Sequence, residues 1–335
     1  MNWETVRSFL VEVGEEIADY AFHKLSTESS SELSAVHTIS NSDTIYQIDS
    51  HAEEVIVQRL EERAHEFGGI VLVAEGIGEN EISFYPKDTP EQNCVLRIIM
   101  DPIDGTRGLM YNKRSAFFLA GAAKNLGANT KLSDIHTAAM VEIPTSKMFL
   151  ADSLSAIKNE GTRAHRRNIF TKELQSLEVC PSEENHLKGG FAQFARFFSP
   201  GRKELADIEE TLLEDLYPNA KPGEILNFED QYISTGGQLY EVLTGKDRFT
   251  ADIRPALFKA FPHLRKGHVC HPYDMAALLV AEEAGIIVTD ISGNTLDAPM
   301  DTDSPVDWIV YANENLRKII QPMLNRILKK NNFSL

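Results

Sequence analysis

The sequence predicts an α+β fold, and three observations support that class. Apolar residues recur at helical spacing near the N-terminus, over residues 6–22. Three strand-like runs follow one another at 116–123, 137–143 and 147–151, separated by turn residues. Helical and strand-like segments occur together again after Asp274. Consecutive short strands predict an antiparallel sheet, and 335 residues are enough to bury a large core.

The N-terminal half opens with a long helix that has one buried stripe and ends before the serine-rich stretch at 26–34. A second helix is predicted from about 51 to 65, where the apolar positions again follow helical spacing and Gly68 comes just beyond the end. Two apolar runs, 70–74 and 95–100, are typical of buried strands.

The C-terminal half is less regular at first. Residues 153–230 mix polar stretches with one helical segment at 202–216. From Asp274 the pattern predicts a helix that Gly285 ends, then strands at 286–289 and 308–312. A last helix is expected to start near Asn313.

Composition narrows the function classes. The chain has 50 acidic and 33 basic residues, a formal net charge of −17, which disfavours a nucleic-acid polymer or an anionic membrane as partner. The N-terminus lacks the basic start and apolar centre of a signal peptide, so we expect a cytoplasmic protein. Its three cysteines are odd in number and far apart, which argues against a disulfide framework or a zinc site.

Six residues, Asp101-Pro102-Ile103-Asp104-Gly105-Thr106, directly follow the apolar run that ends at Met100. Two carboxylates and the carbonyl between them can converge on a hard cation, and Gly105 permits a tight backbone path. Gly105 and Thr106 could open a helical turn whose N–H groups point at a phosphate. The alternative for a single aspartate is a helix cap, but the complete string favours metal and phosphate together.

This string resembles the signature of the inositol monophosphatase-like superfamily of metal-dependent phosphatases, which includes fructose-1,6-bisphosphatases and nucleotide-3′-phosphatases. Two further segments resemble that family in its order along the chain. Residues 70–76 form an apolar run that ends in Glu75, and residues 271–277 place Asp274 at the start of a helix.

The resemblance implies a set of metal ligands and a cofactor. Four carboxylates in one pocket would carry a charge of about −4 and could not all stay ionised without cations. We expect two or three Mg²⁺ ions, because Mg²⁺ favours carboxylate, carbonyl and water oxygens. Glu79 is the alternative to Glu75, which is preferred because it directly ends the strand. The implied ligands are Glu75, Asp101, the Ile103 carbonyl, Asp104 and Asp274.

In the family, the threonine of the signature and an earlier aspartate polarise the attacking water. Thr106 and Asp49 are the counterparts here, and with Glu75 they form the predicted catalytic set. Asp49 has an equally good interpretation as a helix N-cap, with Glu53 completing a capping box. Asp274 could likewise serve as a helix cap.

Substrate contacts are implied at two places. The phosphate would lie beside Gly105, Thr106 and Asp274. The small-residue turn of Ser234, Gly236 and Gly237 resembles the family's substrate-contacting turn, although such a turn can also serve packing alone.

Inositol-specific members of the family place a carboxylate shortly before the second signature, and this sequence departs from them there. The nearest polar candidates are Asp252 and Arg254. Arg107 and Arg114 could neutralise a second phosphate or sulfate group.

The fold implied by the resemblance is a layered αβαβα sandwich of the sugar and inositol phosphatase type. It would contain an antiparallel N-terminal sheet in a metal-site domain, residues 1–152, and a smaller C-terminal α/β substrate domain, residues 153–335. The implied function is Mg²⁺-dependent hydrolysis of a small phosphorylated polyol, sugar or nucleotide by a homo-oligomer. A catalytically silent relative that binds metal and anion for regulation or scaffolding is the alternative.

Overall fold

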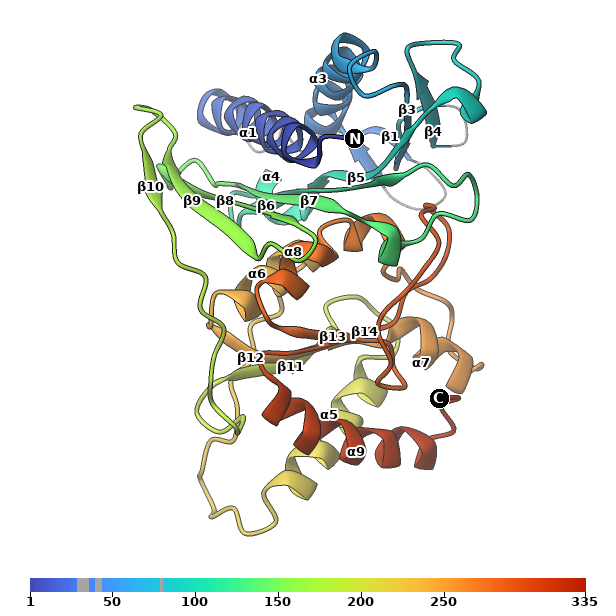
Figure 1. Cartoon of the computed structure of the whole chain (residues 1–335). Helices are drawn as coiled ribbons and strands as arrows, with labels where there is room; N and C mark the ends of the chain where they lie inside the picture. Colours follow the sequence, from blue (N-terminus) through green and yellow to red (C-terminus); the bar gives the residue numbers. More distant parts are fainter. Residues whose placement is uncertain (29–35, 40–43, 79–80) are drawn as a thin grey trace.

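The computed structural model describes the backbone of residues 1–28, 36–39, 44–78 and 81–335, and the side chains of 1–28, 52–78 and 81–335. Five layers follow one another in the order helix, sheet, helix, sheet, helix (Figure 1). This order confirms the layered αβαβα sandwich that the sequence resemblance implied.

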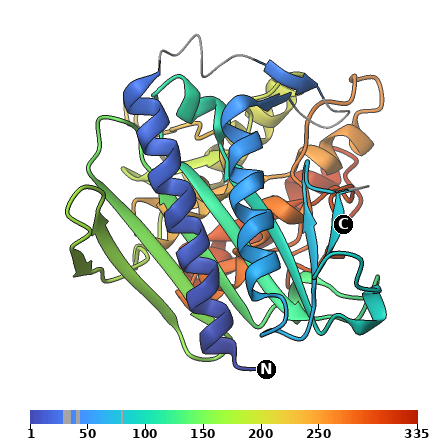
Figure 2. The same cartoon turned by 90° about the horizontal axis from the view of Figure 1, so that it is seen from above.

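The first layer consists of α1 (Trp3–Thr27) and α3 (Gln47–Arg63), which cross one face of the large sheet (Figure 2). Both predicted helices are therefore confirmed, α3 with an earlier start. Gly14 lets α1 lie close to the sheet, because a Cβ atom there would approach Phe118 Cδ1 to 2.5 Å and Val141 Cγ2 to 2.7 Å.

The second layer is an eight-stranded sheet in the order β10-β9-β8-β7-β6-β5-β3-β4. Neighbouring strands are antiparallel except for the parallel pair β3 and β5. The strands are β3 (Ile70–Ala74), β4 (Ile82–Tyr85), β5 (Leu96–Asp104), β6 (Ala116–Lys124), β7 (Thr137–Ile143), β8 (Leu150–Ile157), β9 (Thr162–Asn168) and β10 (Leu174–Ser176). A separate antiparallel pair is formed by β1 (Val36–Ile39) and β2 (Thr44–Tyr46).

The central strands are apolar on both faces because both faces are covered. Along β5 and β6, Ile98 and Phe118 pack under α1 and α3, while Ile99 and Leu119 pack into the second core on the opposite face. The sequences of these strands therefore do not alternate between apolar and polar residues, because neither face of the sheet is exposed to solvent here.

Strand β9 extends the large sheet beyond the region that the sequence resolved. Alternate side chains of β9 form ion pairs with α1. Arg163 pairs with Glu4 at 2.8 Å, and Arg167 pairs with Asp19 at 2.8 Å. Because ion pairs replace apolar contacts here, the strand carries no hydrophobic pattern. The domain boundary predicted at residue 152 lies inside β8, and the sheet of the first half continues to Ser176.

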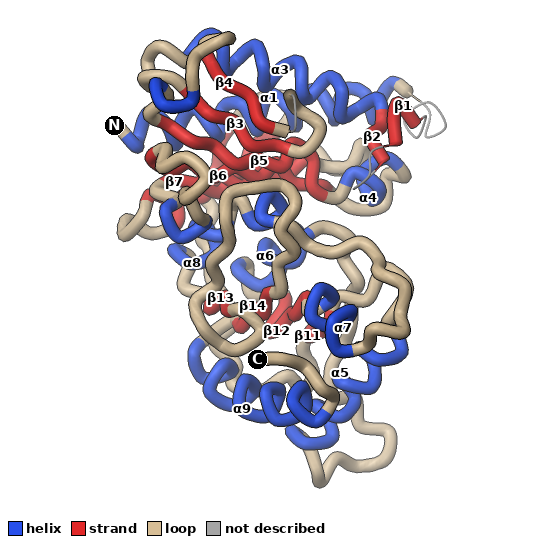
Figure 3. Tube along the Cα trace, turned by 90° about the vertical axis from the view of Figure 1, so that its right-hand side faces the viewer, coloured by secondary structure: helices blue, strands red, loops and turns tan. Residues whose placement is uncertain are grey.

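The other three layers belong mainly to the C-terminal half (Figure 3). The middle layer contains α6 (Thr235–Leu243) and α8 (Leu278–Glu283), and the small sheet has the order β11-β12-β14-β13. Its pairs are antiparallel except β11 with β12. The strands are β11 (Phe191–Phe194), β12 (Asp247–Asp252), β13 (Ile287–Thr289) and β14 (Trp308–Tyr311).

The outer layer is formed by α5 (Arg202–Leu216) and α9 (Glu314–Lys330), with α7 (Arg254–Ala260) beside the small sheet (Figure 1). The predicted helices at 202–216 and from Asn313, which caps α9, are confirmed. The helix predicted from Asp274 is instead two short pieces, the 3₁₀ turn η3 (Pro272–Met275) and α8.

The remaining short elements are α4 (Thr106–Met110), η1 (Glu91–Asn93) and η2 (Leu132–Asp134). Within the described residues, no helix has the length and apolar character needed to cross a bilayer.

Two buried acids in the C-terminal half predict how stability depends on pH. Burial, and next the charge of Glu229, raises the pKa of Glu209 on α5 to about 7, and burial raises that of Asp247 on β12 to about 7. Both groups hold their protons more tightly in the folded than in the unfolded chain. The contribution of these two groups to the free energy of unfolding should therefore fall as pH rises from about 4 to about 8.

Glu209→Gln tests this expectation, because Gln has no proton to lose. We expect the free energy of unfolding of the variant to be higher than that of the wild type by roughly 1–3 kcal/mol near pH 8 and equal to it near pH 5. Urea denaturation measures both values. Glu210→Gln changes the exposed neighbouring residue and should leave the slope with pH unchanged. Parallel pH profiles for the wild type and Glu209→Gln would contradict the expectation.

Candidate metal centre

A bulge at the end of β5 places two aspartates on one side of the sheet. The sequence predicted that the strand ends before Asp101, but β5 continues to Asp104. Asp101 lies opposite Leu119 and Asp104 opposite Phe117, so β5 contains one residue more than β6 over this interval. Residues three apart on a regular strand would face opposite sides. The extra residue therefore allows both carboxylates to face the same space.

The chain then turns sharply at Gly105, as its sequence position predicted. Its φ of 97° is a left-handed conformation, and a Cβ atom there would lie 3.0 Å from Ser234 Cβ. Thr106 begins the short helix α4, and its Oγ1 donates to the Ile103 carbonyl oxygen over 2.7 Å. Ile103, Gly105 and Thr106 thus lie in one turn beside the two aspartates.

Asp104 accepts three hydrogen bonds from the first turn of α6. Ser234 Oγ donates to Asp104 Oδ2 at 2.8 Å, Gly236 N donates to the same oxygen at 2.5 Å, and Thr235 N donates to Oδ1 at 3.2 Å. Ser234 also caps α6, since its Oγ accepts from Gly237 N at 2.8 Å. These contacts attach the C-terminal half to the end of β5.

The small-residue turn therefore has a packing role that the sequence allowed as an alternative. A Cβ atom on Gly236 would approach Leu119 to 2.7 Å, and one on Gly237 would approach the Tyr232 ring to 2.6 Å. Ser234 lines the pocket described below, whereas Gly236 and Gly237 do not. Contact of this turn with a substrate stays a prediction.

Asp274 reaches the same place from η3. Its Oδ2 accepts from the His271 backbone N–H at 2.6 Å, so it does act as a local cap, although for the 3₁₀ turn and not for α8. The turn is held directly on β6 at Gly121, where a Cβ atom would lie 2.4 Å from the Ala276 carbonyl oxygen. Capping and membership of the acidic cluster are therefore compatible.

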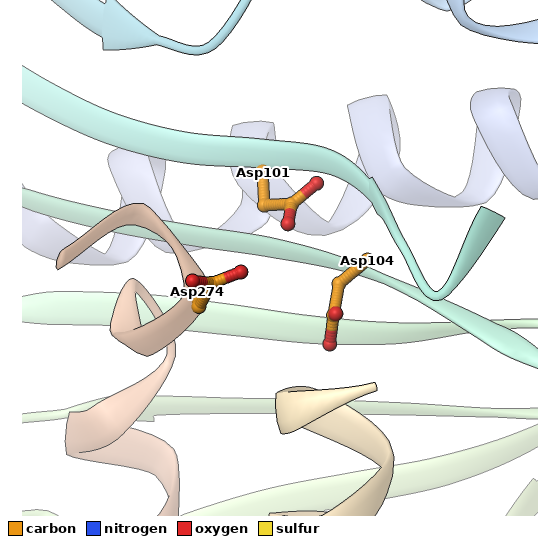
Figure 4. Close-up of side chains that lie close together, drawn as sticks. All are labelled: Asp101, Asp104 and Asp274. Carbon is orange, nitrogen blue, oxygen red and sulfur yellow. The ribbon is translucent and has the colours of Figure 1, made fainter. Parts of the chain in front are cut away.

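The carboxylates of Asp101, Asp104 and Asp274 converge (Figure 4). One oxygen from each lies within 4.8 Å of the others. Burial, followed by the charges of Asp104, Asp274 and Glu75, raises the pKa of Asp101 well above its ordinary value. Burial, followed by the charge of Asp104, likewise raises the pKa of Asp274. Such a cluster of mutually repelling carboxylate oxygens fits a hard divalent metal.

Asp104 differs in degree from its two neighbours. Burial raises its pKa to about 6, and its hydrogen bonds with Gly236, Ser234 and Thr235 limit the rise. Hydrogen bonds to a carboxylate favour its charged form. The three hydrogen bonds that Asp104 accepts therefore stabilise its negative charge in place of water.

A pocket adjoins the cluster between the two halves. Of the predicted site residues it contains Glu75, Gly105, Thr106 and Ser234 as well as the aspartates and Ile103. The sequence did not point to Glu53, Phe197, Phe198, His268 or Tyr273, which also line it. Glu53 had been considered only as a capping partner, and Phe197, Phe198 and His268 come from irregular segments that contain no motif. Tyr273 lies within the 271–277 segment, but no role had been assigned to it.

The structure describes the positions of Glu75 and Asp49 but does not test every role that the sequence predicted for them. Glu75 follows β3 and lines the pocket, and its negative charge contributes to the raised pKa of Asp101. The competing Glu79 lies outside the described residues. Asp49 belongs to the first turn of α3, but its side chain is also outside the described part, so its roles as cap or as catalytic group stay predictions.

Asp252 and Arg254, the polar candidates before the second signature, form a buried pair. Arg254 Nε lies 2.8 Å from Asp252 Oδ1, and its Nη2 lies 2.5 Å from Oδ2. Arg254 lines the pocket, whereas Asp252 does not. The chain thus presents a guanidinium where inositol-specific members are expected to present a carboxylate.

Comparison with known proteins gives structural relatives only. No protein-family model and no curated protein matches the sequence. Among solved structures, the extragenic suppressor protein SuhB of Bartonella henselae is 17% identical, with a TM-score of 0.64 over 97% of this chain and 99% of that one. The MJ0109 gene product, described as an inositol monophosphatase-fructose 1,6 bisphosphatase, is 16% identical, with a TM-score of 0.64 over 96% and 100%.

The IMPase TM1415 of Thermotoga maritima is 14% identical, with a TM-score of 0.61 over 97% of this chain and 98% of that one. The matches extend over nearly the whole of each chain, at identities that establish the fold alone. The chain therefore has the inositol monophosphatase fold.

Proposed function

We propose that this chain is a Mg²⁺-dependent phosphomonoesterase that acts on a small phosphorylated polyol, sugar or nucleotide. The observation that carries the proposal is the cluster of Asp101, Asp104 and Asp274, of which Asp104 is buried and the other two are half-buried, beside a pocket between the two halves. A structural role alone does not explain three mutually repelling carboxylates at the edge of a pocket. The structural neighbours described as phosphatases support the same reaction class.

In this proposal Glu75, Asp101, Asp104, Asp274 and the Ile103 carbonyl hold the cations. When bound, Mg²⁺ supplies positive charge to the substrate phosphate and makes a coordinated water more acidic. Water adds to phosphorus, the bond from phosphorus to the alcohol oxygen breaks, and that oxygen takes up a proton. The products are the alcohol and inorganic phosphate.

Thr106 orients the attacking water in this scheme. Its hydroxyl already donates to Ile103, and a hydroxyl that donates one hydrogen bond can also accept one. Asp49 is its proposed partner, while the Gly105 and Thr106 backbone, with Ser234, Gly236 and Gly237, would bound the phosphate and the rest of the substrate. A cytoplasmic location and homo-oligomeric assembly also stay proposals.

Phosphate release tests the reaction directly. We expect Mg²⁺-dependent release, abolished by EDTA, from at least one member of a panel of inositol phosphates, sugar mono- and bisphosphates and nucleoside bisphosphates. Asp274→Asn should abolish it, because the variant removes a ligand charge. A protein that binds Mg²⁺ but releases phosphate from no member would instead favour the catalytically silent relative.

Asp101→Asn separates metal binding from folding. The change removes one of the mutually repelling carboxylates, so the metal-free variant should melt at or above the wild-type temperature at neutral pH. Mg²⁺ should raise the melting temperature of the wild type and leave that of the variant unchanged. Calorimetry with EDTA and with Mg²⁺ gives both values, and equal Mg²⁺ stabilisation of the two proteins would exclude Asp101 as a ligand.

Thr106→Ala tests the proposed role in water activation. We expect kcat to fall by about 10²-fold or more, because general acid–base contributions have that size, while the Mg²⁺ concentration for half-maximal activity changes little. Thr106→Ser keeps the hydroxyl and should retain most activity. A parallel loss of Mg²⁺ affinity in the alanine variant would assign Thr106 to the metal site instead.

A further inference from the structure

A second cavity lies between the large sheet and α6, apart from the metal centre. It has a volume of about 420 Å³, and none of its lining residues also lines the pocket beside the three aspartates. Strands β6 to β9 contribute residues to one side of this cavity, and α6 contributes residues to the other. The proposed reaction makes no use of it.

A row of charged side chains crosses the sheet at this second cavity. Arg166 on β9 lies opposite Asp152 on β8, and Phe117 on β6 lies opposite Glu142 on β7. The Asp152 backbone N–H donates to Glu142 Oε2 at 3.1 Å, which joins the two pairs. All four residues line the cavity. Many neighbouring positions along these strands belong to the apolar core, so the charges are concentrated at the cavity.

The charge of Asp152 is balanced within this row. Its carboxylate accepts two hydrogen bonds from Arg166, at 2.6 and 2.8 Å, and a third from the Tyr240 hydroxyl at 2.6 Å. The bond from Tyr240 also ties α6 to the sheet. A paired carboxylate with three donors has little need of a further cation, so Asp152 and Arg166 are explained by structure alone.

Arg114 lies at this cavity and not at the metal centre, although the sequence suggested that it could neutralise an anionic group of the substrate. Its guanidinium pairs with Asp230 and, at 3.2 Å, with Glu241. Glu241 also pairs with Lys246 at 3.2 Å. Two cations thus face two carboxylates, and these four groups contribute little net charge.

Glu142 is an acid without a paired cation. Its side chain is 7% exposed, and among the described residues its carboxylate accepts only from the Ser115 hydroxyl, at 2.7 Å, and from the Asp152 N–H. Lys246 attracts it only from beyond 4.0 Å and pairs with Glu241 instead. Burial, with a further contribution from the charge of Asp152, raises the pKa of Glu142. A carboxylate has room for about four hydrogen bonds, so Glu142 can accept more donors.

Two other residues of the lining have polar groups to offer. Thr145 is 6% exposed, and its hydroxyl has no hydrogen-bond partner in the described part of the chain. Lys113 is exposed and makes no ion pair with any described residue. By itself Lys113 is an ordinary surface lysine, but in a cavity with Glu142 it produces two ends of opposite charge. The buried end is negative, and the end near solvent is positive.

We propose that this cavity binds a small zwitterion of the amino acid type, whose ammonium group lies at Glu142 and whose carboxylate lies at Lys113. An ammonium group has three N–H donors, for which Glu142 and Thr145 offer acceptors. The cavity volume falls within the range of about 300–1,000 Å³ that is typical of small-molecule sites. This inference goes beyond the proposed function and does not depend on it.

Calorimetric titration of the whole chain in Mg²⁺ tests the inference. The probes are glycine, β-alanine, 4-aminobutyrate and 6-aminohexanoate, in which the two charges are progressively farther apart. We expect at least one of them to bind with a Kd of about 1 mM or tighter. For the tightest binder, the acid that lacks the amine and the amine that lacks the acid should each bind at least about tenfold more weakly.

Two variants assign the two ends of the ligand. Glu142→Gln should remove the preference for the amino acid over the acid that lacks the amine, and Lys113→Gln should remove the preference over the amine that lacks the acid. Lys147→Gln is the matched control, because Lys147 is exposed in a nearby turn and does not line the cavity. Circular dichroism checks folding, and the exposed Lys113 keeps the test valid if Glu142→Gln does not fold.

The outcomes are distinct from those for phosphate release. Dissociation constants weaker than about 1 mM for all four amino acids would overturn the inference and leave the row at Glu142 as a structural network. Binding that is lost in Asp274→Asn but kept in Glu142→Gln would place the probe at the metal centre and also overturn it. Binding that requires both Glu142 and Lys113 would support the inference, whether or not the chain releases phosphate from any substrate.

Discussion

The attachment of Asp104 to the first turn of α6 is the interaction on which the rest of the site depends. Its carboxylate accepts one hydroxyl and two backbone donors from Ser234, Thr235 and Gly236. The strand that ends at Asp104 belongs to the large sheet, and α6 lies between the two sheets, where it contacts β6 as well as β12 and β14. Asp104 therefore takes part both in the contact between the two halves of the molecule and in the acidic cluster between them.

This double role sets an electrostatic constraint. Asp101 and Asp274 are each neighbours of a carboxylate that the fold keeps in place, so their repulsion cannot be relieved by moving Asp104 away. Protonation or a bound cation can relieve it. The architecture thus holds the site in a form that is costly when empty, which is the pre-organisation expected of a metal centre.

Much of the fold was predictable because helices such as α1 and α5 follow apolar periodicity, and because β3 and β7 are buried on both faces. Strand β9 could not be predicted, because it packs against acidic side chains of α1 through ion pairs, which give the strand no apolar periodicity. The end of β5 was also misjudged. A bulge makes two residues three apart share a face, and periodicity alone would separate them.

The acidic cluster could be inferred from motifs at Asp101, Asp104 and Asp274, since each motif is local in sequence. The aromatic part of the pocket lining could not be inferred, because Phe198 and His268 are brought together by the packing of 199–200 against Gly267. Contacts of that kind depend on tertiary structure.

The pocket is lined by two unlike groups of residues, the acidic cluster and Arg107 with Phe197 and Phe198, and this has a stereochemical consequence. An elongated dianion that enters between them cannot bind equally well in both directions, because divalent cations can be held by the carboxylates and not by the guanidinium side. Its two ends are therefore distinguished by charge before shape matters. For an unsymmetrical ligand with two charged ends, the fold itself would therefore set the direction in which the ligand enters the pocket.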